Sequence, residues 1–235
     1  MIWTSKEVLF YFYFLSYSGI LYMMKTLVWD FNGTIVDDTE LCLAIENEML
    51  EARGMRSGYT VEEYRDMFCF PIKKYYRILG YDFKEESYEE LSVEFNEKYD
   101  AGFPYLKLVP GCLELLEYAK KNGVHNVIVS ATRQSTLEKE CEILDISSYF
   151  ETLVGIADDL ASSKVESAVR WMKGAKVNPK DCIVIGDSIH DLETAQAIQA
   201  GDCFLVACGH QSYQVLKKSH DKVFHTLEEV EPYLR

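Results

Sequence analysis

The feature that most constrains the fold is a short apolar run, 26–29, that ends abruptly in polar residues. Two later apolar runs, 127–129 and 183–185, end in the same way. Each has the length and composition of a buried strand, and segments with helical spacing separate them. Alternating strands and helices predict a parallel sheet with right-handed crossovers. We therefore expect an α/β protein with a Rossmann-like three-layer core.

One long interval departs from this alternation. Between 39 and 103 no β-branched runs occur, and apolar residues recur at helical spacing. Thr60 followed by Glu63 forms a capping box, the signature of a helix start. We expect four helices in this insert, near 39–53, 60–69, 72–79 and 87–101. The expected organisation is a core of residues 24–38 and 104–235, interrupted by a helical insert.

The alternation resumes after the insert. We expect strands near 126–130, 152–156, 182–186, 203–207 and 222–225. We expect helices near 111–122, 135–144, 163–174, 189–200, 211–218 and 227–234. Asp30, Ser130 and Asp187 follow strands, so they should meet at the carboxyl edge of the sheet, where ligands bind in open α/β folds.

Chemistry at that edge follows from the residue types. Asp30 could attack phosphorus as a carboxylate nucleophile and form an aspartyl-phosphate. A simpler interpretation is a polar turn after a core strand, with Asn32-Gly33 as its turn residues. Ser130 could likewise only cap a turn, and Ser188 with Asp191 could only cap a helix. Lys164 at a helix start is disfavoured by the helix dipole, which suggests an anionic partner.

Together these residues resemble the haloacid dehalogenase superfamily, most closely its phosphoglycolate phosphatase-like branch with a small helical cap. The matching motifs are Asp30-Phe31-Asn32-Gly33-Thr34, then Ser130, Lys164, and Gly186-Asp187 with Asp191. The resemblance covers about residues 24–227, and it implies that 39–103 is the cap. It implies Asp30, Asn32, Ser130 and Lys164 as catalytic-site residues.

The resemblance also implies a Mg²⁺ site. Its ligands would be Asp30, the backbone carbonyl of Asn32, Asp187, and Asp191 directly or through water. Mg²⁺ prefers such oxygen ligands. The expected substrate is a small phosphorylated metabolite. Its candidate contacts are Gly33, Thr34, Ala131 and Thr132, with Lys73 or Lys74 in the cap reaching a second anion.

Asn32 departs from the superfamily pattern, which has an Asp that protonates the leaving group and later activates water. An amide does neither, and general acid-base catalysis contributes roughly 10²- to 10⁴-fold. Three interpretations remain: a variant acting on substrates with good leaving groups, a weakened or inactive phosphometabolite-binding protein, and an engineered trap. Dehalogenase chemistry is a further enzymatic alternative, although Gly33-Thr34 and the paired acids favour phosphate and metal.

Composition narrows the class of partner. The chain has 24 basic and 38 acidic residues and a net charge of -14, which argues against a nucleic-acid surface. Seven dispersed cysteines without C-x-x-C spacing argue against a zinc site or redox motif and suggest reduced thiols in a cytoplasm.

Residues 1–23 form an aromatic extension before the first expected strand. It is shorter and richer in hydroxyls than a spanning helix of roughly 20 apolar residues, so a membrane segment is not favoured. It also lacks the features of a strong signal peptide. The interpretation we favour is that translation starts at Met23 or Met24.

We predict that residues 1–23 are dispensable. A protein that starts at Met24 should match the full chain in solubility and melting temperature, because the expected core begins only afterwards. Thermal unfolding of both forms checks this. A large drop in melting temperature would show instead that the extension packs on the core.

Overall fold

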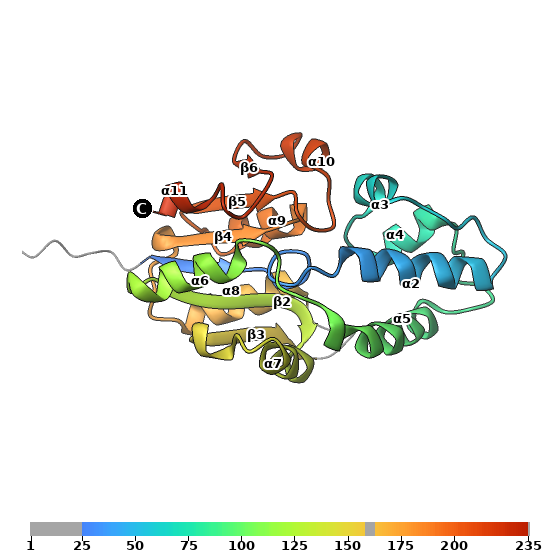
Figure 1. Ribbon diagram of the computed structural model, residues 1–235, viewed down its shortest axis with the longest axis horizontal. Helices are drawn as coiled ribbons and strands as arrows, with labels where there is room; N and C mark the ends of the chain where they lie inside the picture. The colour runs from blue at the N-terminus through green and yellow to red at the C-terminus, as the bar shows by residue number, and fades with distance from the viewer. Residues whose placement is uncertain (1–24, 158–162, 235) are drawn as a thin grey trace, which may run out of the picture.

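The computed structural model of the protein describes residues 25–157 and 163–234. Residues 1–23, and the expectation attached to them, lie outside the described residues. The described chain has a parallel sheet covered by helices on both faces, and a group of helices beyond one end of the sheet (Figure 1). This confirms the expected α/β core with a helical insertion between the first two strands.

The sheet has six parallel strands in the order β3-β2-β1-β4-β5-β6. They are β1 (Thr26–Trp29), β2 (His125–Arg133), β3 (Thr152–Ile156), β4 (Cys182–Gly186), β5 (Asp202–Val206) and β6 (Val223–Phe224). The central strand β1 pairs with both β2 and β4, with Trp29 level with Ile128 and Ile185. The polar residues that follow these strands therefore emerge side by side.

Alternation along β1 divides the core into two apolar layers. Leu27 and Trp29 face one layer, and Val28 faces the other, as the two-residue period of a strand requires. The first layer includes residues of α6 (Cys112–Lys121), α7 (Gln134–Ile143) and α11 (Glu231–Leu234). The second includes residues of α8 (Lys164–Gly174), α9 (Ile189–Ala197) and α10 (Tyr213–Lys217). Short 3-10 turns are η1 (Phe103–Tyr105), η2 (Ser147–Tyr149) and η3 (Pro179–Asp181).

The inserted helices pack around a separate apolar cluster rich in aromatic rings. They are α2 (Thr39–Ala52), α3 (Val61–Met67), α4 (Ile72–Leu79) and α5 (Tyr88–Gly102). The chain enters and leaves the insert along paired backbone, because Val36 bridges to Leu108 and the Asp37 N–H donates to the Lys107 carbonyl. We keep 39–103 as the proposed cap and 24–38 with 104–235 as the proposed core.

Several boundaries differ from the sequence prediction. Strand β2 continues beyond Ser130 to Arg133, which pairs with Ile156 after a register shift. Helix α10 begins only at Tyr213, because the Ser212 hydroxyl accepts from the Val215 N–H and caps it there. The last helix, expected over 227–234, is a single turn from Glu231. The capping box at Thr60 forms as predicted, and Ser163 with Glu166 forms another at the start of α8.

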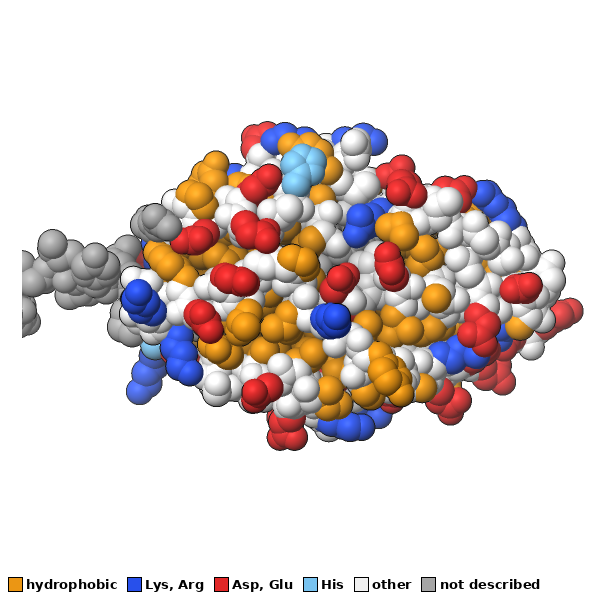
Figure 2. All heavy atoms as spheres, in the orientation of Figure 1, with side chains coloured by type: hydrophobic (Ala, Val, Ile, Leu, Met, Phe, Trp, Pro, Cys, Tyr) orange, Lys and Arg blue, Asp and Glu red, His pale blue; other side chains and the backbone are white. Residues whose placement is uncertain are grey.

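On the face shown in Figure 2, Lys and Arg side chains stand at separate places among Asp and Glu side chains. In the described part of the chain, no helix is long and apolar enough to cross a membrane.

Candidate active site

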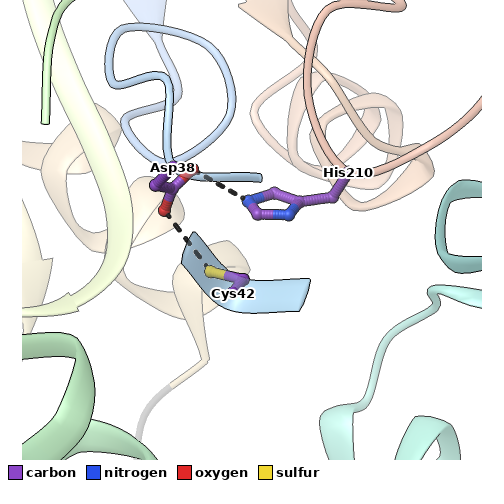
Figure 3. Close-up of side chains that lie close together, drawn as sticks. All are labelled: Asp38, Cys42 and His210. Atoms are coloured by element: carbon purple, nitrogen blue, oxygen red, sulfur yellow. Dashed lines mark hydrogen bonds and ion pairs between the residues drawn. The ribbon is translucent and has the colours of Figure 1, made fainter. Parts of the chain in front are cut away.

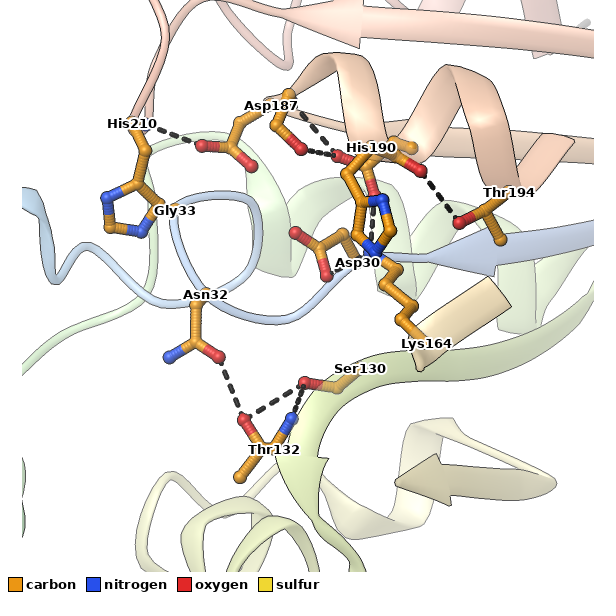
Figure 4. Close-up of polar contacts among 12 residues, drawn as sticks. Asp30, Asn32, Gly33, Ser130, Thr132, Lys164, Asp187, His190, Thr194 and His210 are labelled. Carbon is orange, nitrogen blue, oxygen red and sulfur yellow. Dashed lines mark hydrogen bonds and ion pairs between the residues drawn. The ribbon is translucent and has the colours of Figure 1, made fainter. Parts of the chain in front are cut away.

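A cavity of about 400 Å³ lies between the cap and the carboxyl edge of the sheet. Asp30, Asn32, Lys164 and Asp187 line its floor, and aromatic residues of the cap line much of the rest. The structure therefore brings Asp30, Lys164 and Asp187 to one cavity, while Ser130 and Asp191 are buried and are not among its lining residues. Figure 4 shows how their side chains converge from different elements.

Three carboxylates form the centre of the site. Oxygens of Asp30, after β1, and of Asp187 and Asp191, after β4 and in α9, lie within 4.8 Å of one another. Lys164, the first residue of α8, joins two of them: its Nζ lies 2.5 Å from Asp30 Oδ1 and also donates to Asp191 Oδ1. Lys164 is only 4% exposed. A buried ammonium needs such partners, because an unpaired charge is costly in the interior.

Burial and mutual repulsion shape the ionisation of this group. Burial raises the pKa of Asp30, repulsion from Asp191 adds to the rise, and Lys164 opposes it. Burial also raises the pKa of Asp187, with Asp191 adding to the rise and His210 opposing it. For Lys164, burial alone would lower the pKa, but Asp191 and Asp30 raise it above its ordinary value. The ammonium is therefore held in its charged form.

These residues fit a hard divalent cation. Their donors are carboxylate oxygens, the ligands that Mg²⁺ prefers, and repulsion among them would be relieved by a cation. Asp191 has other partners as well: its Oδ2 accepts from the Ser188 N–H at 3.0 Å and from the Ser188 hydroxyl at 2.7 Å. The capping interpretation of Ser188 and Asp191 is thus confirmed, and it leaves the metal role of Asp191 open.

Glycines allow the backbone to approach Asp187 closely. Gly33 has a φ of +72°, and a Cβ there would lie 2.5 Å from Asp187 Oδ2. The neighbouring His210 N–H donates to the same oxygen at 2.5 Å. Gly33 therefore serves the motif loop by its conformation and by its lack of a side chain. The hydroxyl of Thr34 is buried and has no hydrogen-bond partner among the described residues.

Asn32 is fixed by hydrogen bonds on both sides of its amide. Its Oδ1 accepts from Thr132 Oγ1 at 2.9 Å, and its Nδ2 donates to Asp38 Oδ2 at 2.9 Å and to Tyr99 Oη at 2.8 Å. Ser130 Oγ in turn donates to Thr132 Oγ1 at 3.0 Å. The predicted residues Asn32, Ser130 and Thr132 thus form one hydrogen-bonded chain.

Asp38 is the most connected acid beside the cavity. It accepts from the Gly33 N–H at 2.9 Å and from the Tyr99 hydroxyl at 2.8 Å, besides Asn32. His210 Nε2 lies 3.3 Å from its Oδ1. Burial alone would raise the pKa of Asp38, but His210 and these hydrogen bonds hold it below its ordinary value. Asp38 is therefore an ionised carboxylate.

Figure 3 shows that Asp38 also faces Cys42, whose thiol donates to it across 3.8 Å. Ligand atoms of Asp38, Cys42 and His210 lie within 4.8 Å of one another, a set that could hold a metal ion. Hydrogen bonds already engage it, because His210 Nδ1 also pairs with the Tyr64 hydroxyl at 2.9 Å. Burial would lower the pKa of His210, but Asp38 and Asp187 raise it to about 9. Its charge balances that of Asp38.

Of the other predicted substrate contacts, some line the cavity and others do not. Ala131 and Thr132 line the cavity. Lys73 and Lys74 are exposed on α4 and are not among the lining residues, and Lys73 Nζ lies 5.5 Å from the ring centre of Phe83. Their role toward a second anion stays a prediction. Tyr99 and His210 were missed because their hydrogen bonds join distant parts of the chain.

Comparisons with known proteins agree with this geometry. Residues 27–203 match the family of haloacid dehalogenase-like hydrolases. The protein belongs to this family. Over 74% of the chain it is 25% identical to phosphoglycolate phosphatase 1 of Pseudomonas aeruginosa, of which the match spans 66%. Over 81% of the chain it is 27% identical to a phosphoglycolate phosphatase of Xylella fastidiosa, of which the match spans 83%.

A solved structure shows the same fold as this hydrolase-family chain. It is a haloacid dehalogenase-like hydrolase from Streptococcus pneumoniae, with a TM-score of 0.75 and 19% identity. The likeness covers 91% of this chain and 99% of that one. It extends over the cap as well as the core.

We predict that Asp187→Asn abolishes Mg²⁺ binding at the sheet edge, because a hydrated ion loses one of few fixed anionic ligands. Calorimetric titration with Mg²⁺ measures this. Asp221→Asn, a change of equal charge at an exposed position, is the control and should bind as the unmodified protein does. Unchanged affinity in Asp187→Asn would refute the assignment.

Proposed function

We propose that the protein is a Mg²⁺-dependent phosphatase that hydrolyses a small phosphomonoester through an aspartyl-phosphate on Asp30. The observation that carries this proposal is the placement of Asp30 in the cavity beside Lys164, Asp187 and Asp191. The two relatives named as phosphoglycolate phosphatases support the reaction class.

In the first half-reaction a carboxylate oxygen of Asp30 forms a bond to phosphorus, and the bond from phosphorus to the leaving alkoxide or aryloxide breaks. Lys164 keeps Asp30 oriented and offsets the charge of Asp191. To stabilise the charge of the phosphoryl oxygens, the Ser130 hydroxyl would turn toward them from Thr132 Oγ1, to which it donates in the structure, and the backbone amides near Thr132 would offer further donors. A Mg²⁺ ion bound by Asp30, Asp187, Asp191 and the Asn32 carbonyl would neutralise part of that charge.

In the second half-reaction water attacks the aspartyl-phosphate, releasing inorganic phosphate and the free carboxylate. This step needs a group that takes a proton from water. The Asn32 amide cannot take a proton from water. Its Nδ2 group already donates hydrogen bonds to Asp38 Oδ2 and Tyr99 Oη. Substrates whose leaving group departs without a proton, such as aryl or acyl phosphates, are therefore favoured in the first step, and the second step should be slow.

The proposal predicts Mg²⁺-dependent release of phosphate from an aryl phosphate. Activity should disappear in Asp30→Asn, since the amide is not a nucleophile, and on removal of Mg²⁺ with a chelator. Asp221→Asn, which removes a carboxyl at an exposed position, is the matched control. Binding of phosphate esters without any phosphate release would favour a non-catalytic phosphometabolite-binding protein. Halide release from a 2-haloacid would favour the dehalogenase alternative.

We predict that Asn32→Asp raises the steady-state turnover of alkyl phosphates by roughly 10²- to 10⁴-fold, the contribution of a positioned acid-base group. Repulsion from ionised Asp38 should raise the pKa of the new carboxyl, which suits a proton donor. The phosphoenzyme should also become shorter-lived in this variant, as acid quench and intact-mass spectrometry would measure.

Asn32 precedes Gly33, a sequence prone to deamidation, so peptide mass spectrometry must show that the amide is intact in the unmodified protein. Thr132→Ser, which keeps the hydroxyl beside Asn32 but adds no acid, controls for general loosening of the site. If the intact protein hydrolyses alkyl phosphates as fast as Asn32→Asp, another group supplies the proton transfer.

A further inference from the structure

One face of α2 runs along the cavity from the reaction centre into the cap. Asp38, Cys42 and Glu46 recur every four residues, so they share a face of the helix, and all three line the cavity. At 1.5 Å per residue, the backbone of Glu46 lies about 12 Å beyond that of Asp38. The cavity therefore has a second end, remote from Asp30 and built from cap residues.

Glu46 at that end is buried and incompletely partnered. It is 4% exposed, and its Oε2 has no hydrogen-bond partner among the described residues. Burial raises the pKa of Glu46 to about 8, against the opposing effect of a hydrogen bond from the Tyr76 hydroxyl. A buried acceptor left unpaired is costly, so this oxygen is expected to meet a donor that the chain itself does not provide.

A second carboxyl has the same character. Glu140 of α7 is 3% exposed, lines the same cavity, and has an Oε2 without a hydrogen-bond partner in the described ranges. Burial raises the pKa of Glu140 to about 8, and repulsion from Asp100 and Asp38 adds to the rise. The cavity wall thus contains two buried carboxyls with an oxygen left unpaired within the described chain, those of Glu46 and Glu140, in addition to the carboxylates around Asp30.

The walls around Glu46 suit a cation. Tyr75 and Tyr76 line the cavity, and after burial the charge of Glu46 is the largest cause that raises the pKa of each phenol, which places both close to Glu46. Aromatic faces attract ammonium groups, and most strongly in desolvated sites. Among the described residues that the cap contributes to the cavity wall, there is no Lys or Arg. A carboxylate at this end would find no cationic side chain from the cap.

We propose that the Glu46 end of the cavity is a subsite for a primary amine or alkylammonium group, which makes the substrate an amine-bearing phosphomonoester. This inference rests on the proposed function, because it assigns the phosphoryl end of the same molecule to Asp30. The ammonium meets the unpaired Glu46 oxygen and the tyrosine rings while the phosphate lies at the carboxylate cluster. Phosphoglycolate, whose remote group is a carboxylate, is disfavoured because the described cap residues that line the cavity include no Lys or Arg to pair with it.

The test measures binding without requiring turnover. Non-hydrolysable ω-aminoalkyl phosphonates, with chains from ethyl to hexyl, are titrated calorimetrically into the full-length protein with Mg²⁺. Alkyl, ω-hydroxyalkyl and ω-carboxyalkyl phosphonates of equal length are the comparison ligands. At the best length the amine should bind roughly tenfold or more tightly than the alkyl analogue, which is the size of one charge-assisted contact.

Glu46→Gln should remove that preference, so that the amine and alkyl phosphonates of equal length bind with equal affinity. Its melting temperature should stay close to that of the unmodified protein, since the amide resembles the protonated carboxyl. Glu51→Gln, at an exposed position of the same helix, should keep the preference. Glu46→Asp should retain part of it.

Equal binding of amine and alkyl ligands, or tighter binding of the hydroxyl or carboxylate series, would overturn the subsite. The proposed function fails separately. If the amine preference is present but neither the protein nor Asn32→Asp releases phosphate from any ester, the amine subsite is supported and the phosphatase function is refuted. If aryl phosphate is hydrolysed without an amine preference, the phosphatase function is supported and the amine subsite is refuted.

Discussion

The buried contact of Lys164 with Asp30 and Asp191 is the interaction on which the rest of the site depends. Carboxylates from β1 and from the start of α9 meet at one edge of the sheet, where they repel one another. Lys164 enters from the first turn of α8, a position that the helix dipole disfavours for a cation. The carboxylates make that position favourable, and the capping box of Ser163 and Glu166 fixes where the helix begins. Losing one partner of such a buried group would leave an uncompensated charge.

Contacts between the cap and the core close the cavity above this group. The Arg65 guanidinium of α3 donates to the carbonyls of Gly209 and Cys208 at 2.7 and 2.8 Å, and Gln211 Nε2 donates to the Phe68 carbonyl at 2.9 Å. The ring of Phe68 stacks on His210, with centres 4.9 Å apart. The loop after β5 therefore contacts both the cap and the core. Its carbonyls accept hydrogen bonds from Arg65 of α3, and its His210 N–H donates to Asp187. The position of the cap and the geometry of the proposed metal site depend on the same few residues.

Much of the core could be predicted from the sequence because its signals are local. Apolar runs of strand length end at Asp30 and Asp187, and parallel strands bring such ends together without any knowledge of side-chain contacts. Tyr99 and His210 gave no comparable signal. Their partners lie far away in the chain, as in the contact of Tyr64 with His210 across 146 positions. Lys73 is a different case: its charge suggests an anion site, the fold places it at an exposed position over aromatic rings, and its role toward a second anion stays a prediction.

Asn32 has a structural role beside Asp38 as well as lacking the acid-base function of an Asp. An Asp at this position would face the ionised Asp38 directly, and one of the two would have to hold a proton. The amide removes this conflict by donating to Asp38, and the Tyr99 hydroxyl adds a second donor. Asp38 is thereby kept charged beside His210, and His210 ties the cap to the Asp187 loop. The amide therefore favours a fixed, fully hydrogen-bonded arrangement over proton transfer at this atom. In such a site the ease of reaction is governed by the leaving group and by how well the cap end of the cavity holds the rest of the substrate.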